Sequence, residues 1–155
     1  MNTSSFQIRL ALVLAVLAFI WINSMLSGDI SQRESDKVLE VVEPVVEPVQ
    51  QQLEDMGYHV CKRNLVRKMA HFAEYTVLGA AMLLLFTTRD SRSRYLPPML
   101  LCFGAACVDE GIQIFAVNRG PQFKDVLLDF SGACCGILGM ALVVLIVCAL
   151  RRRRV

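Results

Sequence analysis

Three apolar stretches of the 155-residue chain carry ionisable side chains whose spacing places them on common helix faces. Arg67, His71 and Glu74 follow one another at i, i+4 and i+7, and residues three or four positions apart are neighbours on a helix surface. Imidazoles and carboxylates are the usual groups for proton transfer, because both exchange protons readily. We therefore take His71, Glu74 and Asp109 as the candidate catalytic residues.

A second set of polar residues is predicted to bind a ligand beside these three. Asp125 and Asp129 are four residues apart. Two carboxylates held that close repel each other, so either one of them holds a proton or both face a cation. Basic side chains in the same region would hold an anionic headgroup. The candidate ligand-binding residues are Arg67, Lys68, Glu110, Gln113, Arg119, Asp125 and Asp129.

No metal ligands are assigned from the sequence, and no cofactor is predicted. The six cysteines form no C-x-x-C pair, and the sequence contains no H-E-x-x-H motif. A divalent cation held among His71, Glu74, Asp109 and Asp125 stays open as an alternative. No nucleophile motif names a reaction, so the sequence leaves it open whether the protein is an enzyme.

Four long apolar runs have to position these side chains. They cover approximately residues 8–26, 67–87, 96–117 and 126–150, and each can cross about 30 Å of hydrocarbon as a helix. Inside lipid a segment must satisfy its own backbone hydrogen bonds, so the runs should be helical. The sequence thus predicts an all-α fold, a single membrane domain over residues 1–155 with four transmembrane helices.

The distribution of charge predicts the orientation of these helices. One side of the membrane would hold 8 basic residues and 1 acidic residue, a net charge of +7. These are Arg9, the arginines at 89, 92 and 94, the arginine run 151–154, and Asp90. The rest of the chain holds 8 basic and 13 acidic residues, or −5. Lysine and arginine are retained in the cytoplasm, so both termini are predicted to be cytoplasmic and the polar residues to lie near the outer face. The arginine run flanks a span, which favours contact with anionic lipid over nucleic-acid binding.

Residues 28–65 are predicted to form the only sizeable outer loop. Valines between positions 38 and 49 fit one helical face, but Pro44 and Pro48 oppose a continuous helix. We predict a broken helix or an extended segment. The run before this loop is predicted to be a retained anchor, because no small-x-small cleavage site follows it.

A glycine pattern in the fourth run predicts close contact with a neighbouring helix. Gly132 and Gly136 form a G-x-x-x-G motif, and Gly139 follows. Small residues at this spacing let two membrane helices approach closely.

Two of the polar motifs resemble those of the VanZ-like family. Residues 67–79 read RKMAHFAEYTVLG and are similar to the family pattern R-K-x-x-H-F-x-E-Y-x-x-L-G, and residues 109–115 read DEGIQIF and are similar to D-E-x-x-Q-x-F. Arg119 follows at the expected place, and Asp125 and Gly132 match residues that open the family's last helix. The outer end of the first span, with Ser24, Ser31 and Ser35, is similar to the family's serine-containing stretch.

The resemblance covers nearly the whole chain, with one departure. The family's last helix usually carries asparagine where this chain has Asp129, so a fixed metal or proton stoichiometry does not carry over. The resemblance implies a multi-pass protein of the bacterial cell membrane, in a family associated with resistance to teicoplanin, a lipid-bearing glycopeptide. The implied partners are membrane lipid and a lipid-linked cell-wall precursor or lipoglycopeptide, with no nucleic acid.

Two functions follow from these observations. The first is an envelope protein whose outer-leaflet polar site binds or modifies a lipid-linked or anionic ligand and influences glycopeptide susceptibility. The second is a structural or partner-binding membrane module whose buried polar network only locks the helices together. A transport pathway is disfavoured, because the inner halves of the predicted spans lack ionisable residues.

Overall fold

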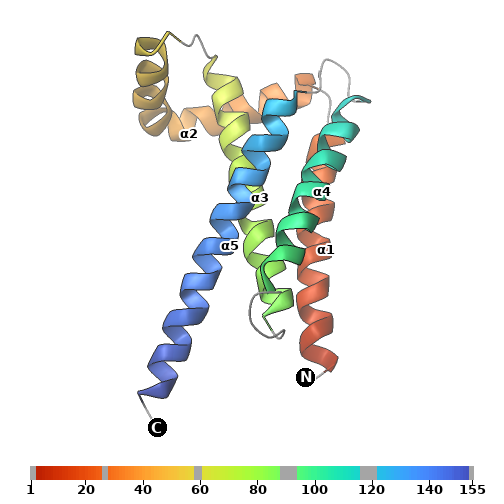
Figure 1. Cartoon of the computed structure of the whole chain (residues 1–155). Helices are drawn as coiled ribbons and strands as arrows, with labels where there is room; N and C mark the ends of the chain where they lie inside the picture. The colour runs from red at the N-terminus through yellow and green to blue at the C-terminus, as the bar shows by residue number, and fades with distance from the viewer. Residues whose placement is uncertain (1–2, 26–27, 58–60, 88–93, 116–121, 154–155) are drawn as a thin grey trace.

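The computed structural model describes residues 3–25, 28–57, 61–87, 94–115 and 122–153, with residues 28–37 described by their backbone alone. Within these residues the chain forms five helices and no strand (Figure 1). The predicted all-α fold is therefore confirmed for the described part of the chain.

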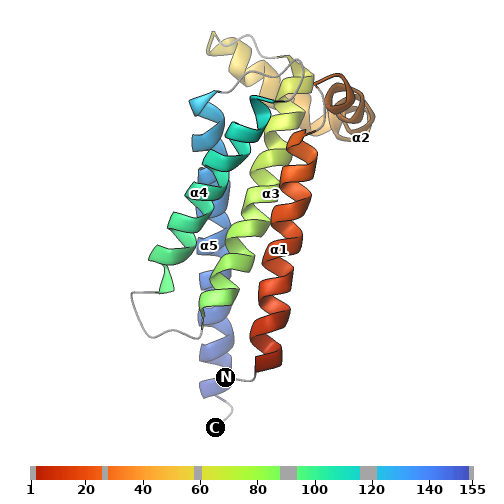
Figure 2. The same cartoon turned by 90° about the vertical axis from the view of Figure 1, so that its right-hand side faces the viewer.

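Four of the helices run side by side along the long direction of the molecule (Figures 1 and 2). They are α1 (Thr3–Met25), α3 (Lys62–Phe86), α4 (Leu96–Gln113) and α5 (Phe123–Arg152). The remaining helix, α2 (Gly28–Asp55), lies at one end of this bundle. At the opposite end, α1 begins and α5 ends.

The bundle buries charged side chains and exposes apolar ones, the reverse of a water-soluble protein. Phe19 on α1 is 59% exposed and Leu138 on α5 is 69% exposed. Asp109 and Asp129, by contrast, are 0% and 2% exposed. A surface of large apolar side chains is unfavourable in water and stable where hydrocarbon surrounds it. This distribution is that of a membrane protein.

Among the described residues, three helices are long and apolar enough to cross a membrane: α1, α3 and α5. The helix α4 is not one of them, although the sequence predicts a span there. It has 18 residues and carries Asp109, Glu110 and Gln113 in its last turns. Carboxylates and amides lower the hydropathy of a helix whether or not the bundle covers them, so composition alone does not identify α4 as a span.

The predicted outer loop is largely the helix α2, which continues through Pro44 and Pro48. The helix is continuous through both prolines, so the predicted break and the predicted extended segment are both wrong. Proline removes a backbone hydrogen bond and clashes with the preceding turn, which bends a helix. Figure 1 shows that α2 changes direction along its length. Lys62 Nζ lies 3.2 Å from Glu43 Oε1 and 3.4 Å from Glu47 Oε1, so α2 is tied to the start of α3.

The most extensive helix contact is between α3 and α5. A methyl group added at Gly132 would overlap the carbonyl oxygen of Phe72, and one added at Gly136 would overlap that of Thr76. The absence of side chains therefore allows the two backbones to touch. The predicted close contact is confirmed for Gly132 and Gly136, whereas the space beside Gly139 is open among the described residues.

Arg9 joins α1 to the end of α3 that lies away from α2. Its Nη1 donates hydrogen bonds to the carbonyl oxygen of Leu84, at 2.8 Å, and to Thr87 Oγ1, at 3.0 Å. The last carbonyls of a helix have no partner within the helix, and a basic side chain satisfies them. Arg9 therefore caps α3 in addition to adding charge at this end of the bundle.

Candidate functional site

The buried polar side chains of α3, α4 and α5 gather in the half of the bundle nearest α2. They meet there because α3 begins, α4 ends and α5 begins at that end (Figure 1). Each of these helices carries its polar residues in the turns close to that end. We refer to the set as the polar cluster, which consists of Arg67, Lys68, His71, Glu74, Asp109, Glu110, Gln113, Asp125 and Asp129.

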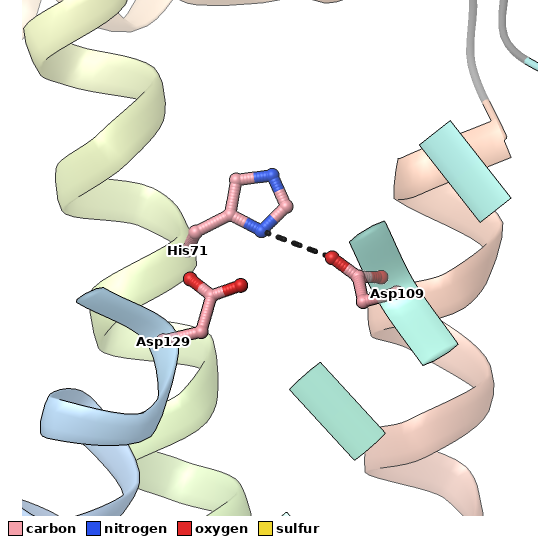
Figure 3. Close-up of side chains that lie close together, drawn as sticks. All are labelled: His71, Asp109 and Asp129. Atoms are coloured by element: carbon pink, nitrogen blue, oxygen red, sulfur yellow. Dashed lines mark ion pairs between the residues drawn. The ribbon is translucent and has the colours of Figure 1, made fainter. Parts of the chain in front are cut away.

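The centre of the polar cluster contains one imidazole and two carboxylates from three different helices. His71 Nδ1 lies 3.8 Å from Asp109 Oδ2, and Asp129 points toward the same space from α5 (Figure 3). Ligand atoms of His71, Asp109 and Asp129 all lie within 4.8 Å of one another. Such a group can share a proton or hold a cation.

Hydrogen bonds hold the carboxylates on α4 in place. Gln113 Nε2 donates to Asp109 Oδ2 at 3.2 Å, as the i, i+4 spacing predicts. Glu110 accepts a hydrogen bond from the backbone N–H of Gln122, just before α5. The two acids at the end of α4 thus point to different neighbours: Asp109 faces the centre, and Glu110 connects α4 to the start of α5.

The two aspartates at the start of α5 also have different partners. Asp125 forms an ion pair with Lys68, whereas Asp129 faces His71 and Asp109 (Figure 3). The sequence grouped Asp125, not Asp129, with His71 and Asp109 as an alternative cation site. The structure corrects this grouping, because a lysine already neutralises Asp125.

Glu74 lies between the polar cluster and α1. Its Oε2 is 3.8 Å from His71 Nδ1, and its Oε1 accepts a hydrogen bond from Asn23 Nδ2 at 3.0 Å. Asn23 was not among the predicted site residues. The only feature of the sequence that could have indicated it is that it places an amide side chain near the end of the first apolar run. Ser24, next to it, is fully buried, while Ser31 and Ser35 fall outside the described side chains.

A small cavity opens inside the polar cluster. Its volume of about 10 Å³ is close to the minimum that holds one water molecule. Arg67 lines this cavity and forms no ion pair within the described residues, although its charge also acts on the carboxylate of Glu110. The residues around the cavity are Arg67, Lys68, His71, Gln113, Asp125, Leu128 and Asp129.

A larger, apolar groove of about 430 Å³ lies between α1 and α3. Among the described residues that line it, Glu74 is the only ionisable one, so this carboxyl group connects the groove to the polar cluster. The lining residues are Ala15, Val16, Phe19, Ile20, Ala73, Glu74 and Val77.

The structure therefore brings together every predicted site residue that it describes. Among the candidate catalytic residues, Glu74 and Asp109 each place a carboxylate oxygen 3.8 Å from Nδ1 of His71. Arg119, the remaining predicted ligand-binding residue, lies outside the described residues.

The fold and the site define a class: a helical membrane protein that buries a polar cluster between its spans. A family model described as VanZ/LLP1 matches residues 9–146, nearly the whole chain. The chain belongs to the VanZ/LLP1 family, and the resemblance of its motifs is confirmed. Comparison with curated proteins and with solved structures gives no match.

Proposed function

We propose that this protein is a bacterial cell-membrane protein that binds a lipid-linked, anionic envelope ligand at the polar cluster. Membership of the VanZ/LLP1 family suggests an association with glycopeptide resistance. We further propose that the bound ligand is a cell-wall precursor or a lipoglycopeptide, and that binding changes susceptibility to teicoplanin-type antibiotics.

The proposed topology has four spans, with α4 as the additional one and both termini in the cytoplasm. The position of α4 beside the three apolar helices supports this topology (Figure 2). So do Arg151 and Arg152 in the last turn of α5, because α5 ends at the same end of the bundle where α1 begins. The polar cluster then lies toward the outer leaflet, where lipid-linked wall precursors are assembled into the envelope.

Arg67 provides the observation on which the ligand assignment rests. Its half-buried guanidinium lines the cavity and has no ion-pair partner among the described residues, whereas Lys68 beside it is paired with Asp125. A charged side chain at membrane depth is costly unless it is paired. Phosphate and carboxylate groups satisfy arginine through two parallel hydrogen bonds. An anionic headgroup is therefore the ligand chemistry that suits Arg67.

The apolar groove between α1 and α3 supports a ligand that also carries a hydrocarbon chain. Its wall is apolar except for Glu74, and apolar contacts with a lipid chain would fill its volume of about 430 Å³. Since Glu74 also contacts His71, a chain in the groove would lie next to the polar cluster that holds the headgroup.

The experiment compares Arg67→Gln with Lys124→Gln, which removes the same charge from an exposed position near the start of α5. Each variant is expressed at matched membrane abundance and assayed for teicoplanin susceptibility. Binding of a polyprenyl phosphate to the purified protein is measured in parallel. We expect Arg67→Gln to weaken binding by about tenfold or more, because the charge-assisted hydrogen bonds of the guanidinium are lost, and to reduce protection. Lys124→Gln should match the wild type.

The structural alternative makes the opposite prediction. It is favoured by two contacts that join helices through polar groups, Lys68 with Asp125 and Asn23 with Glu74. If the polar cluster only locks the helices, an abundant Arg67→Gln protein keeps full protection and unchanged lipid-phosphate binding. That result would reject ligand binding at Arg67.

A further inference from the structure

We propose that His71, Asp109 and Asp129 bind one divalent transition-metal cation, Zn²⁺ or Mn²⁺, at the centre of the polar cluster. The cation would join α3, α4 and α5 at the point where their side chains converge (Figure 3). This ligand set differs from the one that the sequence left open, because Asp129 takes the place of Glu74 and Asp125.

The distances between the three side chains suit a single ion. Ligand atoms that share a tetrahedral cation at about 2.1 Å lie about 3.4 Å from one another. His71 Nδ1 and Asp109 Oδ2 are 3.8 Å apart, and all three ligand atoms lie within 4.8 Å of one another. Small side-chain movements would bring all three onto one cation without any change in the helices.

Asp129 is the strongest indication of a ligand. This residue is 2% exposed, and its Oδ1 atom has no hydrogen-bond partner in the described part of the chain. A buried carboxylate without a partner is unfavourable. Figure 3 shows its carboxylate turned toward His71 and Asp109, so a cation between them would satisfy it.

The size and the surroundings of the centre also favour a single ion. The cavity lined by His71 and Asp129 has a volume of about 10 Å³, which is enough for one ion or one water molecule. Gln113 donates its hydrogen bond to Asp109, and contacts of this kind orient a metal ligand. Lys68 is paired with Asp125. Its charge therefore does not have to leave the three ligands before a cation binds them.

The ligand types select the class of metal. Calcium and magnesium prefer sites made only of oxygen, whereas an imidazole nitrogen with two carboxylate oxygens suits zinc or manganese. Three protein ligands also leave one position free, as in zinc sites that bind a water or substrate. The proposed metal site lies in the same polar cluster as the proposed ligand site. The two proposals are independent, because metal binding is measured without the anionic ligand.

The test is metal content of the full chain purified in detergent without chelator. The protein is stripped with EDTA, dialysed against Zn²⁺ or Mn²⁺ in separate samples, and analysed by plasma mass spectrometry and thermal unfolding. We expect one ion per chain for one of the two metals and a higher unfolding temperature in its presence. Wild-type protein that binds neither metal after reloading would overturn the proposal.

Variants then assign the ligands. His71→Gln and Asp129→Asn should each lose the bound ion. The matched control combines Asp125→Asn with Lys68→Gln, which removes the whole ion pair without leaving a free lysine charge, and it should retain the ion. Arg67→Gln should also retain the ion, so failure of the anion site and failure of the metal site give different results. One ion per chain in folded Asp129→Asn protein, or equal loss in the double variant and in Asp129→Asn, would contradict the assignment. If Asp129→Asn does not fold, the wild-type stoichiometry still decides whether a metal binds.

Discussion

Asn23 of α1 donates a hydrogen bond from Nδ2 to Oε1 of Glu74 on α3 at 3.0 Å. The other oxygen of the same carboxylate, Oε2, lies 3.8 Å from His71 Nδ1. Glu74 thereby connects the first helix of the bundle with the polar cluster, and it also forms part of the wall of the apolar groove. A structural role and a role in ligand binding are both compatible with this position, and the two roles respond differently to substitution.

Glu74→Gln separates these roles. Glutamine keeps an oxygen that can accept from Asn23 but removes the ionisable group. If Glu74 handles protons or ligand, the variant should insert normally, change the free energy of unfolding by less than about 1 kcal/mol, and lose protection against teicoplanin. His71→Gln should lose protection as well. The measurements are antibiotic susceptibility, membrane abundance and thermal unfolding for each variant.

Asn23→Ala is the control for Glu74→Gln, because it removes the hydrogen bond and leaves the carboxyl group. It should cost about 1 kcal/mol of stability and retain protection. Full protection in abundant, stable Glu74→Gln and His71→Gln proteins would remove both residues from the proposed site. Loss of those two proteins from the membrane would instead support the structural role.

The contact between α3 and α5 predicts different effects for three glycines on one helix. Leucine at Gly132 or Gly136 must separate α5 from the backbone of Phe72 or Thr76, which should destabilise the protein by about 1–3 kcal/mol. Gly139→Leu is the matched control, since the space beside Gly139 is open among the described residues. Thermal unfolding in detergent measures all three. Equal melting temperatures for the three variants would mean that α5 does not pack on α3 through this face.

The proposed topology predicts which engineered cysteines react in intact cells. A cysteine placed within residues 50–54 of α2 should react with a membrane-impermeant thiol reagent, and one placed within residues 91–93 should not. The background carries Cys61→Ser, because Cys61 is exposed at the start of α3. Lysed cells, in which both positions should react, provide the control. Protection of 50–54 together with labelling of 91–93 would reverse the orientation and place the polar cluster on the cytoplasmic side.

Local features of the fold and the site could be predicted from the sequence. The apolar runs coincide with helices, because a long apolar segment satisfies its backbone hydrogen bonds as a helix. Length and hydropathy identify α1, α3 and α5 as possible spans, but not α4. The face shared by His71 and Glu74, and the contact between Gln113 and Asp109, follow from helix periodicity. The close approach at Gly132 and Gly136 likewise follows from spacing within one helix.

Contacts between helices depended on the tertiary structure. Asp125 and Asp129 are equivalent in the sequence, both polar and on one helix face, yet the register of α5 along α3 pairs Asp125 with Lys68 and places Asp129, one turn further on, beside His71. Asn23 reaches Glu74, and Arg9 reaches the end of α3, only because α1 packs against α3 in a particular register. Periodicity determines which residues of one helix share a face. The rotation and register of neighbouring helices come from side-chain packing across the whole bundle, and no single segment of the sequence contains them.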